Sequence, residues 1–456
     1  MKIDLPAGLV TWVEATVRNR VRGAAPHFAG ASRSAWTVDI EQPDGGSRAL
    51  FLLQDKGHGR GSARDAAVLR ALAATPVPVP EVIDTCDECS AILLERLPGR
   101  SDFPAVEREA DREPTARHLM ELTGELHRLD PTQLAIPHLE LPAEPEDCAR
   151  TSLAQARAAC DALGATADPF FSFALDWLDC NVPAQVERYS LVHSDMGPGN
   201  FLYADGQVTG IVDWEVAHFG DPMEDLAAIA VRDMATPVGS LSRRFREYET
   251  SSDIRVDLGR VHYYRALVLV RNSLMIGLGL AQPPEGFDVI EMTMYQTLLM
   301  RAAALVLCDN LDALRPRTDE AVPHLEAHST ATSQQTLIAA IERDLGEALA
   351  LGADPGALRS VERVRRGLAA LTHAEAVGST LDRRERDDTA SLVGVPIASG
   401  NEDPDSALRY ALAETARPTD SALARYFARR MHRLAERRRP LMGELFERLP
   451  QPLEPA

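Results

Sequence analysis

The alternation of hydrophobic and polar residues divides the chain into a short strand-rich part and a longer helical part. Residues 35–53 predict two strands joined by a turn at 43–46, because AWTVDI alternates, PDGG is a turn sequence and RALFLL is apolar. Residues 62–74 place Ala and Leu at helical spacing, and 90–97 predict another strand that Pro-Gly at 98–99 ends. This order predicts a small, mostly antiparallel sheet with one helix.

Helical spacing of apolar residues begins at about residue 104 and continues to the C-terminus. The predicted helices cover 113–130, 150–163, 168–180, 221–235, 257–281, 286–313, 334–350, 355–375, 404–415 and 419–446. Residues 201–215 predict two short strands, 317–333 a polar linker, and 387–404 a loop that contains Gly, Pro and Asn. The longest apolar run, 266–281, is too short to span a bilayer and predicts a buried helix.

Composition and charge narrow the class of protein. The 456 residues are 45% hydrophobic and 25% charged, as in a folded protein of two or three domains. With 48 basic and 68 acidic residues the net charge is −20, which argues against binding along a nucleic-acid backbone. Residues 1–320 hold 30 basic and 48 acidic side chains, and the remainder hold 18 and 20. This difference favours a domain boundary near residue 320.

Cysteines and the N-terminus predict a cytoplasmic location. The spacing of Cys86 and Cys89 is that of half a zinc site, but no second such pair follows in the sequence, so we expect reduced thiols. The first residues lack the charged-then-apolar pattern of a signal peptide. Only two lysines occur, Lys2 and Lys56, so any step that needs a lysine has few candidates.

Residues 191–227 carry the chemistry. His193, Asp195 and Asn200 share one loop, and Asp213 ends the second strand that follows. A hairpin between them would bring two carboxylates and an amide together, with glycines 197 and 199 letting the backbone approach a ligand. This set suits phosphoryl transfer, which needs an oriented hydroxyl and a divalent cation more than covalent chemistry from the protein. Asp195 can accept the hydroxyl proton, and the oxygens of Asn200 and Asp213 suit Mg²⁺.

The motif HxDxxxxN, followed by DWE and GDPxxDLA, resembles the aminoglycoside phosphotransferase-like kinases, which are relatives of the protein kinases. A looser match over residues 28–99 extends the resemblance to roughly residues 10–315. Within that family, the sequence is most similar to the kinase module fused to some acyl-CoA dehydrogenases. The resemblance implies an α+β, protein-kinase-like fold of two lobes. We therefore expect an N-lobe at 1–98, a helical C-lobe at 99–316, a linker at 317–333 and a separate all-α C-terminal domain at 334–456.

The resemblance also implies roles for individual residues. His193 would orient the catalytic loop and Asp195 would be the base, while Asn200 and Asp213 would hold Mg²⁺ with Glu215 as a supporting acid. Asp221 and Asp225 look structural, as caps of backbone amides. The implied cofactor is ATP, with GTP left open. Its site would comprise Gly30, Ala31 and Ser32 as the phosphate loop, Glu95 and Leu97 at the hinge beside adenine, and Lys56 with Asp65 at the phosphates.

Lys56 and Asp65 mark a departure from the family pattern. The second strand of the family's hairpin usually carries a Lys or Arg that holds the phosphates, but here Leu53 or Gln54 occupies that position. Asp65 aligns with the helix Glu that pairs with this cation. We expect Lys56 to take the place of the missing cation, which would require a β-bulge in the strand. Arg60 and Arg64 are the alternative cations. The opposing interpretation is that Lys56 is only a solvated loop lysine.

Two classes of function stay open. The favoured one is a kinase of a small-molecule hydroxyl, enclosed by the helices of 104–180 and 240–315. The resemblance slightly favours a hydroxyacyl-CoA or hydroxy acid, whereas the acidic charge suits an aminoglycoside-type cation. The alternative is a nucleotide-binding regulatory or scaffold protein with weak or no turnover.

The expected partners are a small molecule and neither nucleic acid nor membrane, with a homo-oligomer or a partner contact through the C-terminal helices left open. The seven arginines of 425–439 predict a solvated helix face, a docking helix or an anion site.

Overall fold

We analysed a computed structural model that describes residues 5–27, 33–56, 61–103, 109–283, 287–322, 341, 345–346, 355–394, 404–413 and 417–454. The chain forms two compact units. The first comprises 1–149, 183–261 and 453–456, and the second comprises 150–182 and 262–452. This division differs from the predicted boundaries at 98 and 316, which stay a prediction.

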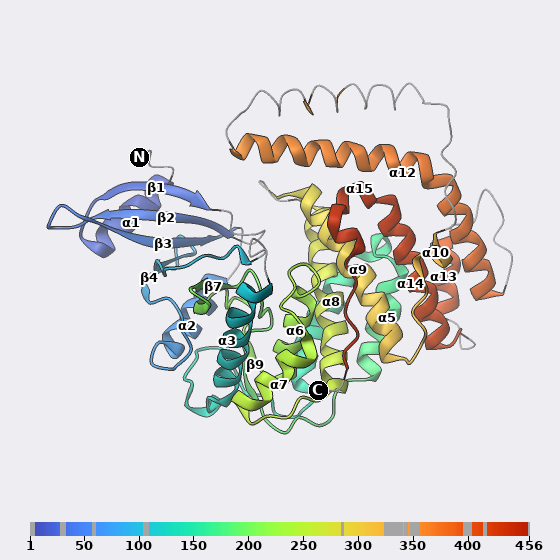
Figure 1. Cartoon of the computed structure of the whole chain (residues 1–456), viewed down its shortest axis with the longest axis horizontal. Coiled ribbons are helices and arrows are strands. Elements are labelled where there is room, and N and C mark those ends of the chain that lie inside the picture. The colour runs from blue at the N-terminus through green and yellow to red at the C-terminus, as the bar shows by residue number, and fades with distance from the viewer. Residues whose placement is uncertain are drawn as a thin grey trace. The chain divides into compact units, whose positions relative to one another are not determined.

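A five-stranded sheet opens the first unit (Figure 1). Its strands are β1 (Val21–His27), β2 (Arg33–Glu41), β3 (Ser47–Asp55), β4 (Val82–Cys86) and β5 (Ala91–Glu95), in the antiparallel order β1-β2-β3-β5-β4. The register of β2 and β3 runs from Arg33 opposite Asp55 to Glu41 opposite Ser47, which confirms the predicted hairpin. Helix α1 (Ala7–Val17) packs Leu9 and Val13 into the core of the sheet, and α2 (Gly61–Leu72) follows β3.

The remainder of the first unit surrounds two short ribbons. Strand β6 (Ser190–Val192) pairs with β9 (His218–Gly220), and β7 (Phe201–Ala204) pairs with β8 (Gln207–Ile211). The amide of Val212 donates to the carbonyl of Asn200 at 3.0 Å, so the loops after β6 and β8 meet. The helices around them are α3 (Glu109–Arg128), α6 (Met223–Arg232) and α7 (Leu241–Ser252). Helix α7 was not expected from the sequence, because only one narrow face of it is apolar.

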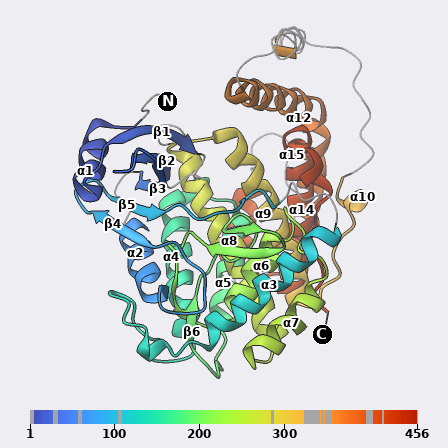
Figure 2. The same ribbon diagram turned by 60° about the vertical axis from the view of Figure 1, so that its left-hand side comes forward.

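The second unit is mainly helical. Its elements are most of α4 (Asp147–Leu163), α5 (Pro169–Cys180), most of α8 (Leu258–Ala281), α9 (Val289–Asn310), α10 (Thr318–Ala321), α12 (Pro355–Val393), α13 (Pro404–Ala413), α14 (Asp420–Arg437) and α15 (Arg439–Met442). Helix α14 packs against α9 and α12, as Figures 1 and 2 show. Helix α8 is long and apolar enough to cross a membrane, so the expectation that its apolar run is too short was wrong. The other part of that prediction, a buried helix, agrees with the structure, because 61% of the most apolar stretch is buried.

Two expectations for the C-terminal region are wrong or fall outside the described residues. Helix α12 continues to Val393, so 387–393 is not a loop, because Thr389 and Asp388 contact Tyr426 and Arg433 of α14. Most of the predicted helix 334–350 lies outside the described residues.

Four of the five arginines of α14 are buried or partly buried, whereas Arg425 is exposed. Arg430 contacts Asp168, Glu385 and Asp405 at 2.7–2.9 Å, and Arg433 contacts Asp388 at 2.7 Å with 3% of its side chain exposed. The segment thus supplies a buried ion-pair network that joins α14 to its neighbouring helices.

Candidate active site

The loop that follows β6 is held in place by α6. The backbone amides of His193 and Ser194 donate to the two carboxylate oxygens of Asp225 at 2.9 and 2.7 Å. Burial alone would raise the pKa of Asp225, but its hydrogen bonds with His127 and with the His193 amide and the charges of the two histidines together lower the pKa. Asp225 caps backbone amides as expected, although they belong to this loop rather than to its own helix. The ionised carboxylate therefore fixes the loop, in which Ser194 has a φ of 66°.

His193 links the loop to the end of β8. Its Nδ1 accepts a hydrogen bond from the Asp195 amide at 3.3 Å, so its Nε2 carries the proton and donates to the carbonyl of Val212 at 2.9 Å. The ring is buried, 4.6 Å from the Trp214 ring. These contacts support the predicted orienting role.

Asp195 lies at the surface of this loop, with 30% of its side chain exposed. Asn200 Nδ2 donates to its Oδ2 and to its carbonyl, both at 2.9 Å. Arg232 of α6 donates from Nε to Oδ1 at 2.9 Å and from Nη2 to Oδ2. Burial alone would raise the pKa of Asp195, but the Arg232 guanidinium holds it below its usual value. Sequence reasoning missed Arg232, which is 37 residues away from Asp195.

Asp213 follows β8 in a left-handed conformation, with a φ of 70° and 41% of its side chain exposed. The amide of the next residue, Trp214, donates to Asp65 Oδ1 at 2.8 Å, which joins the Asp213 loop to α2. Desolvation, followed by the charge of Glu215, raises the pKa of Asp213 to about 7. A divalent cation here would offset that repulsion.

Arg33, the first residue of β2, lies among four carboxylates with 3% of its side chain exposed. Its shortest contact is with Asp65, at 2.5 Å. Glu215, Asp55 and Asp213 follow at 3.0, 3.4 and 3.5 Å. Burial alone would lower the pKa of Arg33, but the carboxylates, Asp65 first, raise it. The cation beside Asp65 is therefore Arg33, which sequence reasoning missed because it lies on the other strand of the hairpin, opposite Asp55.

Comparison with known families decides the assignment. A model of the phosphotransferase enzyme family, APH, matches residues 28–262, which is more than half of the chain. This chain belongs to the phosphotransferase enzyme family. The predicted family, the α+β kinase-like fold with a helical C-terminal region, and the phosphotransferase class are thereby confirmed.

The phosphotransferase is also similar to parts of larger proteins. It is 26% identical over 201 residues to mouse (Mus musculus) acyl-CoA dehydrogenase family member 10, a match that covers 41% of this chain and 18% of that protein. It is 26% identical over 195 residues to chicken (Gallus gallus) member 11, over 39% of this chain and 24% of that protein. The match thus spans less than a quarter of each relative.

Solved structures of phosphotransferases align with the chain at lower identity. Aminoglycoside phosphotransferase APH(4)-Ia, in a complex with ADP and hygromycin B, aligns at 18% identity and a TM-score of 0.48, over 64% of this chain and 98% of that one. Macrolide 2′-phosphotransferase MphH from Brachybacterium faecium aligns at 19% identity and a TM-score of 0.45, over 62% and 95%.

The phosphotransferase's own residues fit a magnesium ion. No group of three or more His, Cys, Asp or Glu side chains in the described part of the chain is arranged to hold a metal. Mg²⁺, however, commonly uses one or two carboxylates and completes its shell with water and phosphate oxygens. The amide nitrogen of Asn200 is committed to Asp195, which leaves its oxygen as a ligand, and Asp213 supplies an exposed carboxylate. Glu215 contacts Arg33, which also lies 3.5 Å from Asp213, so Glu215 would support a metal ion here indirectly.

The predicted nucleotide-binding residues are only partly described. Gly30, Ala31 and Ser32 lie outside the described residues. Glu95 ends β5, and its amide donates to the carbonyl of Glu81 at 2.8 Å. Leu97 covers Gly210 of β8, where a Cβ would lie 2.1 Å from Leu97 Cδ1. Lys56 is half-buried at the end of β3. The cofactor roles of Glu95, Leu97 and Lys56 stay predictions.

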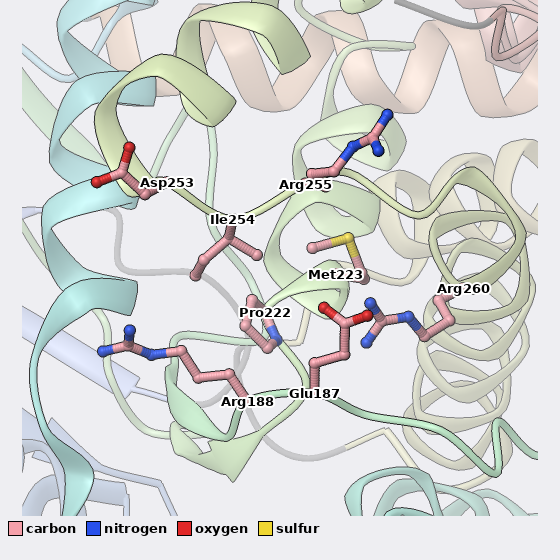
Figure 3. Close-up of a pocket in the computed structure, with 8 residues that line it drawn as sticks. All are labelled: Glu187, Arg188, Pro222, Met223, Asp253, Ile254, Arg255 and Arg260. Atoms are coloured by element: carbon pink, nitrogen blue, oxygen red, sulfur yellow. The ribbon is translucent and has the colours of Figure 1, made fainter.

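A pocket of about 290 Å³ surrounds the start of α6 in the first unit (Figure 3). Pro222 and Met223 line it together with Arg188, Arg255 and Arg260. Arg232 lies at the other end of α6, about 14 Å away by the rise of a helix. None of His193, Asp195, Asn200 and Asp213 lines this pocket.

Proposed function

We propose that this phosphotransferase moves the γ-phosphoryl group of ATP, or of GTP, to a hydroxyl of a small molecule. The observation that carries the proposal is the partly exposed Asp195 carboxylate, held beside Asn200 on a loop that hydrogen-bonds to the Asp213 segment. The hydroxyl oxygen forms a bond to the γ-phosphorus, and the bond from that phosphorus to the bridging oxygen breaks. The nucleoside diphosphate leaves with the electron pair, and Asp195 takes the proton.

Magnesium, when bound, would neutralise the phosphate charges, and Asn200 and Asp213 would hold it with support from Glu215. Arg33 and Asp65 would act on the nucleotide side. Their ion pair connects the sheet to α2, and Arg33 also lies 3.5 Å from Asp213. Arg33 is thus a better-placed candidate for the phosphate cation than Lys56, although both remain proposals.

The proposed acceptor is a hydroxyacyl-CoA or a hydroxy acid. Similarity to two acyl-CoA dehydrogenase family members supports this choice, although the match covers less than a quarter of each. The acidic charge of the chain supports the other candidate, a cationic aminoglycoside-type sugar. Net charge describes a whole surface rather than one pocket, so the similarity weighs slightly more. A cytoplasmic location is part of the proposal.

The alternative is a nucleotide-binding regulatory protein with weak or no turnover. It was favoured by the missing cation on β3, where Leu53 and Gln54 stand. The ion pair between Arg33 and Asp65 weakens it, because a cation is present beside the expected acid.

Transfer of labelled γ-phosphate from Mg·ATP and Mg·GTP to a panel of hydroxyacyl-CoAs, hydroxy acids and aminoglycosides tests the proposal. The Asp195→Asn variant is the matched control, because it keeps the size of the side chain and removes the base. We expect a labelled acceptor with the wild type and transfer about 10²- to 10⁴-fold slower with the variant, at unchanged ATP affinity. Nucleotide binding without any labelled acceptor would instead favour the regulatory protein, and equal rates would remove Asp195 from the mechanism.

A further inference from the structure

We propose that Arg232 is the positioning residue of this active site: it fixes the plane of the Asp195 carboxylate and leaves Oδ1 to receive the acceptor's proton. This inference rests on the proposed phosphotransfer and deepens it. Arg232 ends α6 and belongs to none of the motifs that carried the family resemblance.

The contact between Arg232 and Asp195 has the geometry of a fork. Nε donates to Oδ1 at 2.9 Å and Nη2 donates to Oδ2, so two parallel hydrogen bonds hold one rigid guanidinium against one carboxylate. Such paired, charge-assisted bonds fix orientation as well as distance. Rotation of the Asp195 carboxylate would break both of them at once.

Arg232 is itself held in place by the loop that carries Asp195. Its Nη1 donates to the carbonyl of Pro198 at 2.8 Å. The flanking glycines have φ angles of 136° at Gly197 and 102° at Gly199, a conformation that favours glycine. A Cβ on Gly197 would lie 3.0 Å from Arg232 Cδ, and a Cβ on Gly199 would lie 3.1 Å from Nη1. The two glycines therefore make room for Arg232.

Helix α6 holds the catalytic loop at two points. Asp225 receives the loop amides of His193 and Ser194, and Arg232 contacts Asp195. Seven residues separate Asp225 from Arg232, which is about two helical turns, so both side chains project from the same face. One rigid element thus sets both the backbone and the carboxylate of the loop.

The contacts also distinguish the two oxygens of Asp195. Within the described part of the chain, Oδ2 receives hydrogen bonds from Arg232 and Asn200, whereas Oδ1 receives one from Arg232. Each carboxylate oxygen has about two lone-pair sites. The second site of Oδ1 is therefore the one left to accept the acceptor hydroxyl, and Arg232 determines where it points.

The test compares Arg232→Ala and Arg232→Lys with Arg315→Ala. Arg315 makes the same fork with Asp309 in the second unit, and the side chains of that pair are 22% and 20% exposed, against 27% and 30% for Arg232 and Asp195. We expect Arg232→Ala to lower kcat by about 10- to 100-fold with the KM for ATP nearly unchanged, because the alignment of the base is lost while the nucleotide site is intact. Arg232→Lys should keep only part of the wild-type kcat, since an ammonium group lacks the planar geometry that lets a guanidinium form two parallel hydrogen bonds with a carboxylate. Guanidinium ion added to Arg232→Ala should restore part of the rate, and ammonium ion should not.

Amide hydrogen exchange gives a readout that does not depend on turnover. The amides of residues 195–197, 199 and 200 should exchange faster in Arg232→Ala than in the wild type and should be unchanged in Arg315→Ala. Unchanged exchange at 195–200, or a wild-type kcat in Arg232→Ala, would overturn the positioning role. A kcat loss of equal size in Arg315→Ala would also overturn it. A wild type that phosphorylates no acceptor would count against the proposed function alone, because the exchange experiment would still test Arg232.

Discussion

Asp195 and Asp213 are both carboxylates on loops beside β8, yet their surroundings shift their pKa values in opposite directions. Burial would raise both, but Arg232 holds the pKa of Asp195 low, whereas burial and the charge of Glu215 raise that of Asp213 to about 7. Asp195 therefore stays ionised and can accept a proton. Asp213 loses its proton only near pH 7, and a bound cation would favour its ionised form, so the two acids suit different tasks.

This difference predicts unequal effects on metal-dependent nucleotide binding. Asp213→Ala should weaken the binding of Mg·ATP by about tenfold or more, because a carboxylate neutralises the cation. Asn200→Ala should weaken it less, since an amide oxygen carries no charge. Titration calorimetry with ATP in the presence and absence of Mg²⁺ measures both effects. The same unchanged affinity in both variants would argue against magnesium at these residues.

At the scale of the element, the β2–β3 hairpin determines which cation lies beside Asp65. Its register puts Arg33 opposite Asp55, next to the start of α2, where Arg33 reaches Asp65. Gly61 at the start of α2 allows this approach, because a Cβ there would lie 2.8 Å from Arg33 Nη2. The hairpin thus supplies from its first strand the charge that the second strand lacks.

Substitutions at Arg33 and Lys56 separate the two candidate cations. Arg33→Lys should keep the fold and raise the KM for ATP by about tenfold, because a lysine keeps the charge but not the geometry. Arg33→Ala should also destabilise the protein by about 3–5 kcal/mol, since it leaves buried carboxylates unpaired. Lys56→Ala should behave as the wild type in steady-state kinetics and thermal unfolding. The Lys56 hypothesis predicts the reverse, a raised KM in Lys56→Ala with Arg33→Lys unaffected.

The features that could be predicted from the sequence are local in the chain. The hairpin at 43–46, α2 and the spacing of Asp195, Asn200 and Asp213 each lie within a short stretch whose pattern is sufficient. The contacts of Arg33 with Asp65 and of Arg232 with Asp195 join elements far apart in sequence. The contact of Arg33 with Asp65 could have been indicated by the hairpin register, because the register follows from the turn. Nothing in the local pattern around Arg232 indicates the second.

At the scale of the whole molecule, the arginines beside the candidate site differ in their contacts from those of α14. In the first unit, Arg33 and Arg232 lie against the carboxylates of the candidate site. In the second, Arg430 and Arg433 join α14 to acids on other helices, in a network that is mostly buried. Substitution of one partner in such a network leaves an unpaired buried charge. The second unit therefore depends on these ion pairs for its stability.

The buried His432 of α14 gives the second unit a predictable dependence on pH. Its side chain is 2% exposed, and burial, followed by the charge of Arg301, lowers its pKa to about 4. In the unfolded chain a histidine titrates near pH 6.5, so between about pH 6.5 and 4 the unfolded state binds a proton that the folded state does not. The contribution of this residue to the free energy of unfolding is therefore complete above pH 6.5 and falls by about 3 kcal/mol as the pH drops to 4.

The His432→Gln variant should lose less free energy of unfolding over this range, measured by urea denaturation. A wild-type slope in His432→Gln would show that this imidazole takes up its proton without unfolding the helix around it.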